Sequence, residues 1–292
     1  MSSPLIHPHI PHVAVASACV LGEGTLWDHR TGTVYWVDIK NPGIWHYEPK
    51  TGKHDRVDAR EPVGFLALTP DTDMVIAGFK SGLHRFHLWG GQIQPIVNPE
   101  PDKPGNRLND GHVFPDGGLY FGTMDDSEKS PTGAFWRWDG KKLTCLREGI
   151  TITNGPAFSP DGRTLYATDT LGRTVYAHDL NDGTLGPARV FVRFEEGWGY
   201  PDGMSVDEEG HVWICHWGDS RVTRFRPDGS IERILPVPTA QVTKCAFGGP
   251  DLTTLYITTA AIGRDATIDP MAGHLFAVET GIRGLPALIF HG

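Results

Sequence analysis

Short apolar runs recur at regular distances along the chain, and each has the length of a single β-strand. Six of them share a pattern of β-branched and aromatic residues: VYWVD from Val34, VIAGF from Val75, LYFGT from Leu119, LYATD from Leu165, VWICH from Val212 and LYITT from Leu255. Their spacing of about 40 to 50 residues is the repeat length of a β-propeller blade. The pattern therefore predicts six repeating units.

Each of these runs belongs to a predicted unit of four strands. A turn rich in Gly and Asp precedes it, as in PDGG before Leu119 and PDGRT before Leu165, and such a turn between apolar runs is typical of a hairpin. A third run follows each one, for example GIWHYEP or GHLFAVE, and a fourth often appears, as in ARVFVRF and SIERILP. The sequence predicts an all-β fold, a six-bladed β-propeller with four antiparallel strands per blade.

One domain is expected to span residues 1–292, with residues 1–11 as an N-terminal tail. The strand expected over residues 12–20 precedes the first full blade, so it should complete the last blade and close the ring, which also hides a sheet edge. The chain contains 36 Gly and 23 Pro residues, spread along its whole length. These residues leave little room for long helices and argue against helical bundles, Rossmann folds and (β/α)-barrels.

Charge and cysteine content narrow the partners and the compartment. Lys and Arg number 26 against 35 Asp and Glu, and the formal net charge of −9 argues against nucleic acid and anionic membranes as partners. The first residues do not read as a signal peptide, and no apolar run approaches the ~20 residues of a membrane span. The four cysteines lie far apart without a CxxC pair, which favours free thiols in a cytoplasmic protein over disulfides. No feature of the sequence indicates an oligomeric state.

Polar residues occupy several positions where the chain should enter the innermost strand of a blade. Counting back from the six apolar runs leads to Glu23, Gly64, Asn109, Asn154, Asp202 and Thr243. In a propeller these positions face one mouth of the central channel, so two carboxylates and two amides should converge there. Oxygen donors suit hard divalent cations such as calcium, magnesium or manganese, and two negative charges balance one such ion. Turn formation by Asn-Gly and Asp-Gly is the alternative, but four such residues in one register favour a site.

The segments that carry these residues resemble the regucalcin and gluconolactonase family of six-bladed propellers, the sugar-acid lactonases. The resemblance covers nearly the whole chain, through LGEGTLWDHRTGTVYWVDIK, RLNDGHVFPDGGLYFGTMDD, ITNGPAFSPDGRTLYATDT, YPDGMSVDEEGHVW and KCAFGGPDLTTLYITTA. It implies that Glu23, Asn154 and Asp202 are metal ligands and that Arg107 and Asn109 hold substrate oxygens. Asp202 is also implied as the general base. In the detailed sequence of these motifs, the chain most resembles bacterial pentono- and hexonolactonases such as xylonolactonase, gluconolactonase and arabinolactonase.

One segment departs from the family pattern. After GTM, regucalcin-like members carry a Glu pair that reaches the substrate, whereas this chain reads DDSEKS. Asp126 and Glu128, together with Asp125, are expected to substitute imperfectly for that pair in substrate binding. Substrate choice is therefore less firmly predicted than the class of reaction.

The sequence and the resemblance together predict a metal-dependent lactonase. It would hydrolyse a glucono-, xylono- or arabinono-type lactone to the open aldonic acid, with one divalent ion, calcium, magnesium, manganese, zinc or iron(II), as Lewis acid. Asp202 should remove a proton from the attacking water, and Arg107 should stabilise the developing negative charge. Two alternatives stay open: a non-catalytic calcium-binding propeller like regucalcin, and a phosphotriesterase-like hydrolase. Arg107 favours catalysis over simple metal binding.

Overall fold

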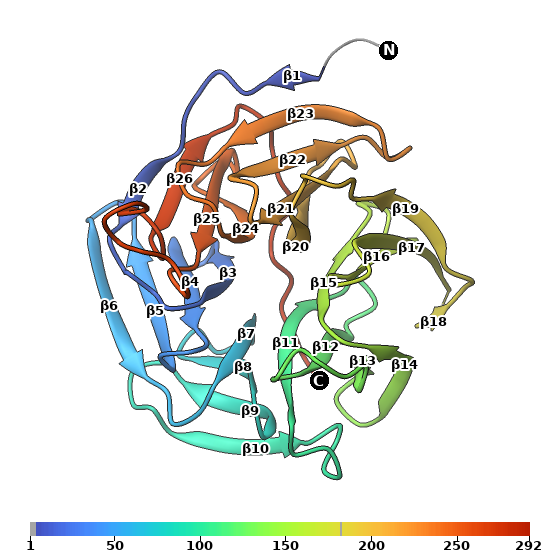
Figure 1. The fold of residues 1–292 in the computed structure, drawn as a ribbon. Coiled ribbons are helices and arrows are strands. Elements are labelled where there is room, and N and C mark those ends of the chain that lie inside the picture. Colours follow the sequence, from blue (N-terminus) through green and yellow to red (C-terminus); the bar gives the residue numbers. More distant parts are fainter. Residues whose placement is uncertain (1–3, 182) are drawn as a thin grey trace.

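The strands of this protein form six small sheets arranged in a ring (Figure 1). The computed structural model describes residues 4–181 and 183–292. These described residues form 26 strands and no helix, and they therefore contain no helix that could cross a membrane. The sheets confirm the predicted all-β, six-bladed propeller.

Blades 1 to 3 are four-stranded antiparallel sheets whose strands follow one another in chain order. Blade 1 consists of β3 (Gly22–Asp28), β4 (Thr33–Asp38), β5 (Gly43–Glu48) and β6 (Lys53–Asp58). Blade 2 consists of β7 (Val63–Leu68), β8 (Met74–Phe79), β9 (Gly82–His87) and β10 (Ile93–Val97). Blade 3 consists of β11 (Asn106–Val113), β12 (Leu119–Asp125), β13 (Gly133–Trp138) and β14 (Leu143–Ile150).

Blades 4 and 5 each carry an additional short strand. Blade 4 consists of β15 (Thr153–Phe158), β16 (Thr164–Asp169), β17 (Thr174–Asn181) and β19 (Arg189–Arg193), and β18 (Thr184–Leu185) pairs with the end of β17. Blade 5 consists of β20 (Tyr200–Val206), β21 (Val212–Trp217), β22 (Arg221–Phe225) and β23 (Ile231–Pro236), with β1 (Leu5–Ile6) parallel to β23. Part of the segment expected as an N-terminal tail is thus an edge strand, while residues 1–3 of that tail lie outside the described residues.

Blade 6 joins both ends of the chain and closes the ring. It consists of β24 (Val242–Gly248), β25 (Thr254–Thr259), β26 (Leu275–Glu279) and, from the start of the chain, β2 (His12–Val15). The predicted closing strand is confirmed, but it is shorter than residues 12–20. Beyond β2, the N–H of Cys19 donates to the Gly273 carbonyl and that of Val20 to the Asp38 carboxylate, so the backbone leaves the sheet.

Six hydrophobic clusters hold the ring together, one between each pair of neighbouring blades. Blade 6 meets blade 1 through Trp27, Trp36 and Tyr256, for example, and the rings of Trp27 and Tyr256 stack with centroids 5.9 Å apart. A blade is therefore covered on both faces, and all six residues of β4 are buried. This explains why the second strand of each blade reads as a continuous apolar run.

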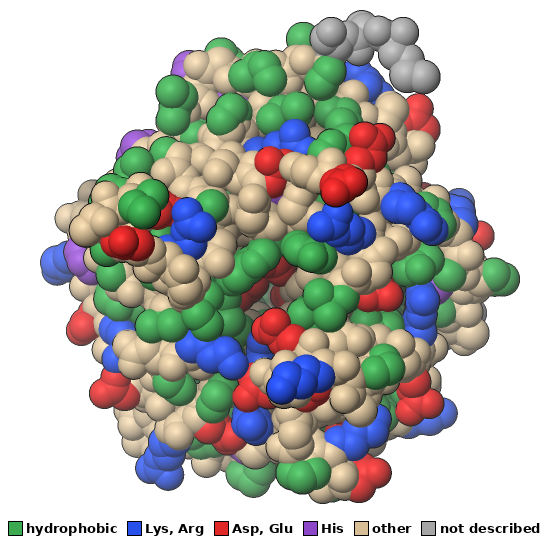
Figure 2. Space-filling model, viewed as in Figure 1, with side chains coloured by type: hydrophobic (Ala, Val, Ile, Leu, Met, Phe, Trp, Pro, Cys, Tyr) green, Lys and Arg blue, Asp and Glu red, His purple; other side chains and the backbone are tan. Residues whose placement is uncertain are grey.

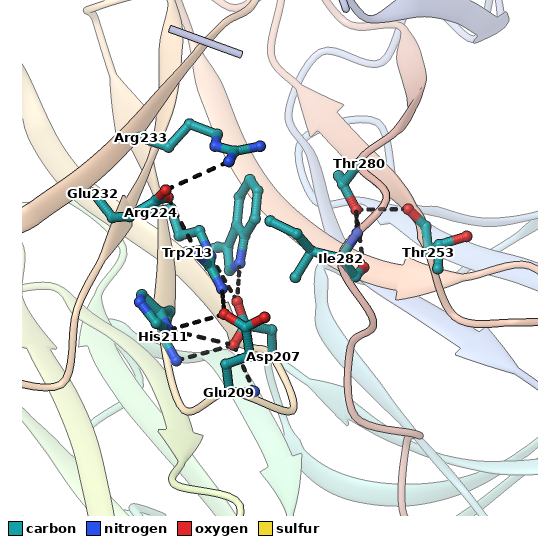
Figure 3. A network of polar contacts seen from close by, with 10 residues as sticks. All are labelled: Asp207, Glu209, His211, Trp213, Arg224, Glu232, Arg233, Thr253, Thr280 and Ile282. Atoms are coloured by element: carbon teal, nitrogen blue, oxygen red, sulfur yellow. Dashed lines mark hydrogen bonds and ion pairs between the residues drawn. The ribbon is translucent and has the colours of Figure 1, made fainter. Parts of the chain in front are cut away.

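A buried polar network fixes the far end of the inner strand of blade 5 (Figure 3). Asp207, which directly follows β20, accepts hydrogen bonds from Trp213 Nε1 and Arg224 Nε, both at 2.8 Å. The Arg224 guanidinium also contacts Glu209 at 2.6 Å. Because every buried charge in this network has a partner, it anchors β20 at the end opposite to Asp202.

The C-terminal segment, residues 280–292, closes the channel at the ends of the inner strands. It passes from blade 5, where the Glu208 N–H donates to the Arg283 carbonyl, to blade 2, where the Phe290 N–H donates to the Leu68 carbonyl. In Figure 1 this red segment runs behind the ring. Above it lies a cavity of about 260 Å³, lined mainly by inner-strand side chains and by Leu285–Leu288. The starts of the inner strands form the opposite mouth.

Candidate functional site

Each of the six inner strands carries a β-bulge close to its start. The pairing register shifts just after Glu23 in β3, just after Asn154 in β15 and just after Pro201 in β20. The inner strands β7, β11 and β24 shift in the same way. A bulge adds an unpaired residue and redirects the neighbouring side chains. The repeated bulges thus give the first residues of all six inner strands a common setting at one mouth of the channel.

The three predicted metal ligands are all buried at this mouth. Glu23, Asn154 and Asp202 are only 6%, 3% and 6% exposed. The side-chain Nδ2 of Asn154 donates to Thr170 Oγ1 at 2.9 Å, and its Oδ1 accepts from Asn109 at 3.0 Å. Figure 2 shows acidic and basic side chains gathered around the centre of the ring. Charged side chains are also scattered over the rest of this face.

Burial makes the two carboxyl groups unusually easy to protonate. The pKa of Glu23 rises to about 7, first because of burial and then because of the Asp110 carboxylate. The pKa of Asp202 is also raised, by burial and then by the charges of Glu23 and Asp110. The part of the chain that the structure describes places no ion-pair partner within 4.0 Å of either carboxylate. A bound cation would relieve this unfavourable burial of charge.

A hydrogen-bonded chain connects Arg107 to the predicted ligands. Arg107 Nη1 donates to Asn109 Oδ1 at 2.6 Å, and Asn109 Nδ2 donates to Asn154 Oδ1 and to the Thr153 carbonyl at 2.6 Å. Arg107 is 3% exposed, so it is not a surface arginine. Its Nη2 makes no hydrogen bond with any residue that the structure describes. The two N–H donors of Nη2, on a fixed guanidinium, are therefore left for a ligand.

The acidic segment after β12 places its three carboxylates differently. Asp126 accepts from Arg107 Nε at 3.0 Å and forms ion pairs with Lys40 and Lys80 at 2.8 and 3.4 Å. Asp125 instead binds the loop that follows it, through Ser127 and two backbone N–H groups, and these contacts lower its pKa to about 2. Glu128 is exposed. Of this segment, Asp126 is the residue that directly contacts the predicted site.

Two further charged residues at the mouth were not singled out from the sequence. Asp110 and Lys244 form a buried ion pair, with Lys244 Nζ 2.5 Å from the Asp110 carboxylate. Burial disfavours the charged form of Lys244, but the Asp110 carboxylate outweighs burial and raises the pKa of the lysine. A signal for this pair was present in the sequence. Asp110 lies within the buried strand NRLNDGHV and Lys244 within the buried strand VTKCAFG, where an unpaired charge would be unfavourable.

The donor chemistry of the mouth fits a hard divalent ion. The described residues contain no group of three or more His, Cys, Asp and Glu side chains that could hold a metal. The predicted set is of another kind, because the amide of Asn154 accompanies the carboxylates of Glu23 and Asp202. Oxygen-only donors with two negative charges match the preference of such ions.

Comparison with known proteins places the chain in a family. Residues 21–261 match the family described as "SMP-30/Gluconolactonase/LRE-like region". An L-arabinolactonase of Azospirillum brasilense is 36% identical, over 93% of this chain and 92% of that protein. A pentonolactonase of Haloferax volcanii is 34% identical, over 93% of this chain and 95% of that protein. Among solved structures, a calcium-binding protein, regucalcin, from Agrobacterium tumefaciens has a TM-score of 0.94 at 29% identity, with 100% of both chains covered. The family match spans most of the chain, which therefore belongs to the SMP-30/gluconolactonase/LRE-like family.

Proposed function

We propose that this protein hydrolyses a sugar-derived lactone to the open aldonic acid. The observation that carries the proposal is the mouth of the channel, where the buried carboxylates of Glu23 and Asp202 lie beside the Arg107–Asn109–Asn154 chain. The relatives named L-arabinolactonase and pentonolactonase support a pentono- or hexonolactone as the substrate. The formal charge of −9 favours such a small substrate over nucleic acid.

Glu23, Asn154 and Asp202 would hold one divalent ion. When bound, the ion supplies a Lewis acid that polarises the lactone carbonyl. The oxygen donors are compatible with calcium, magnesium, manganese, zinc or iron(II), and the similarity to a protein described as calcium-binding supports calcium. The two negative charges of the Glu23 and Asp202 carboxylates favour a divalent ion, because they balance its charge.

Asp202 and Arg107 supply the remaining chemistry. In the proposed reaction, water oxygen forms a bond to the carbonyl carbon, the ring C–O bond breaks, and the leaving ring oxygen receives a proton. Asp202 accepts the proton of the attacking water. The unpaired Nη2 of Arg107 can donate to the carbonyl oxygen as negative charge develops there.

Asn109, Asp126 and Glu128 are proposed to bind the substrate around this centre. Asn109 Oδ1 accepts from Arg107, and Asp126 Oδ1 accepts from Arg107 and Lys40. Asn109 Oδ1 and Asp126 Oδ2, which accepts only from Lys80, each keep a lone pair for a sugar hydroxyl. These contacts also hold the Arg107 guanidinium in place. Glu128 is exposed and would contact only a substrate that extends to the rim.

The protein is also proposed to work in the cytoplasm. Support comes from its cysteines, which are all unpaired: Cys19, Cys145, Cys215 and Cys245. Three of them are buried, and Cys145 is exposed. An exposed free thiol is more usual in reducing compartments.

A lactone panel with a chelated control tests the proposed function. Protein purified without chelator should hydrolyse aldonolactones above the spontaneous rate, stop after removal of divalent ions and recover when one ion is added back. Asp202→Asn should lose ~100- to 10,000-fold in turnover at saturating metal, because an amide cannot accept the proton of water. Asp102→Asn, an exposed change of the same kind, should leave turnover unchanged.

The same panel separates the competing functions. Metal binding without lactone turnover would favour a non-catalytic calcium-binding propeller. Faster hydrolysis of an organophosphate ester than of any lactone would favour a phosphotriesterase-like hydrolase. Full activity in a thoroughly stripped sample would refute the metal mechanism.

A further inference from the structure

We propose that Lys244 is a positioning residue: its ammonium group neutralises Asp110 and thereby leaves the channel mouth with only the two negative charges of Glu23 and Asp202. The inference rests on the metal site of the proposed function. It adds that Lys244 determines which ionic charge the site prefers, although Lys244 need not contact the ion. A net charge of two matches a divalent ion.

The contacts of the pair show how firmly it is held. Lys244 Nζ lies 2.5 Å from the Asp110 carboxylate, and the two side chains are 5% and 3% exposed. The Asp110 carboxylate also accepts from the backbone N–H groups of Gly111 at 2.8 Å and Gly155 at 3.1 Å. Lysine is almost never buried to this extent unless it is paired.

The pair spans the channel and reaches the backbone beside a predicted ligand. Lys244 belongs to β24 of blade 6, Asp110 to β11 of blade 3, and Gly155 to β15 of blade 4. Gly155 directly follows Asn154. The pair thus joins three blades across the mouth and fixes the turn at which Asn154 is presented.

The charges of four buried groups show how the pair affects the net charge of the channel mouth. In their ionised forms, the buried carboxylates of Glu23, Asp110 and Asp202 carry three negative charges, and Lys244 carries one positive charge. Arg107 is counted apart from these four groups, because its guanidinium contacts Asp126 at 3.0 Å, a carboxylate that it shares with Lys40 and Lys80. Lys244 acts electrostatically on both Glu23 and Asp202, so all four groups share one field. Without the lysine, the mouth would carry three negative charges.

The test compares calcium and terbium(III) binding in variants that change the charge stepwise. Asp110→Asn leaves Lys244 uncompensated, so calcium affinity should fall at least about tenfold, and terbium affinity should fall further because the repulsion grows with ionic charge. Lys244→Met combined with Asp110→Asn restores the net charge with an uncharged pair. Calcium affinity of this double variant should return to within about threefold of the wild type. Calorimetry and terbium luminescence give both affinities.

Several outcomes would overturn the inference. A folded double variant that binds calcium as weakly as Asp110→Asn would show that the pair acts through its shape alone, as would equal losses for calcium and terbium. If the double variant does not fold, Lys244→Met alone decides, because it should raise the ratio of terbium to calcium affinity about tenfold. An unchanged ratio refutes the proposal.

A control and the wild type complete the design. Arg30→Met removes an equal charge from a buried aspartate, Asp28, which Arg30 contacts at 2.7 Å at the opposite end of β3. This variant should keep the wild-type ratio of the two affinities. A wild-type protein that binds neither ion would instead refute the metal site itself, which distinguishes the two failures.

Discussion

Arg107 shows how strongly the role of one residue depends on which of its atoms are already bonded. Its Nε and Nη1 are held by Asp126, Asn109 and the Leu108 carbonyl, and only Nη2 is left without a described partner. A lysine has the same charge but lacks the planar fork that makes these contacts together. The charge and the geometry of Arg107 can therefore be tested separately.

Arg107→Ala should lower kcat/KM for the lactone. The loss should correspond to ~2 to 4 kcal/mol of transition-state stabilisation, the cost of losing a donor to a developing oxyanion. Arg107→Lys should also impair catalysis, because the ammonium cannot hold Asp126 and Asn109 while donating to substrate. Metal content should remain near that of the wild type in both. The exposed change Arg163→Ala is the control. Unchanged kinetics in Arg107→Ala would remove the residue from the mechanism, and lost metal would reassign it to support of the metal site.

His216 offers a residue-scale prediction about stability. It is fully buried against Phe194 and donates from Nδ1 to the Trp198 carbonyl at 2.8 Å, with Arg221 and Asp219 as the nearby charged groups. Burial, and then the charge of Arg221, lower the pKa of His216 from 6.5 to about 3. The unfolded chain therefore binds a proton below about pH 6.5 that the folded protein does not accept until about pH 3.

The stability contributed by neutral His216 is complete above pH 6.5 and is lost as the pH falls from 6.5 toward 3. His216→Gln should remove this dependence, so its free energy of unfolding should fall less steeply with acidification than that of the wild type. The difference in slope can reach ~1.4 kcal/mol per pH unit. Urea unfolding between about pH 4 and pH 7 measures it, with exposed His54→Gln as control. Parallel slopes for wild type and His216→Gln would contradict the assignment.

At the scale of elements, neighbouring inner strands approach so closely that a side chain is excluded. A Cβ atom on Gly64, in β7, would lie 2.1 Å from the Asn109 carbonyl oxygen and 2.7 Å from that of Leu108, both in β11. Gly64→Ala should therefore push the start of β11 away and move Arg107 and Asn109 with it. We expect a loss of ~1 to 3 kcal/mol in stability together with reduced lactone turnover.

Gly105→Ala, just before β11, is the matched control, because nothing lies within 4 Å of the added methyl group. Thermal unfolding and lactone kinetics on both variants check the prediction. If Gly64→Ala keeps wild-type stability and turnover, the close approach of β7 and β11 does not position the site.

The strands themselves were readable from the sequence, whereas the direction of individual side chains was not. The repeated runs from Val34 to Leu255 are the second strands of the six blades. They could be recognised because a strand buried on both faces has a continuous apolar sequence. Bulges explain what was missed. In an unbroken strand Asn109 and Asp110 would face opposite sides, but the register shift between Leu108 and Gly111 breaks that alternation. Lys244 lies at a similar shift, so its position at the mouth could not be read from its neighbours.

The whole molecule has one open and one covered end of its channel, and the C-terminal segment makes the difference. Removing residues 285–292 should open the cavity of about 260 Å³ and uncover Phe65 and Val113, which share a buried cluster with Phe290 of the removed segment. The melting temperature should fall by several degrees, roughly 3 to 8 °C for ~1 to 2 kcal/mol. Divalent-ion affinity at the opposite mouth should persist in the folded fraction. A truncated protein as stable as the full chain would show that the segment only lies on the surface.

The pairing of β2 with β26 also orders events during synthesis. β2 leaves the ribosome before any strand of blades 1 to 4, yet its partner β26 is made only after the inner strands of all six blades. Early blades can assemble on one another as they emerge, but the ring cannot close co-translationally before residues 275–279 exist. Until then the nascent chain carries an unpaired strand at its beginning and an incomplete blade at its growing end. Those two edges are where a chaperone, or a second nascent copy, would find this protein most open to strand exchange.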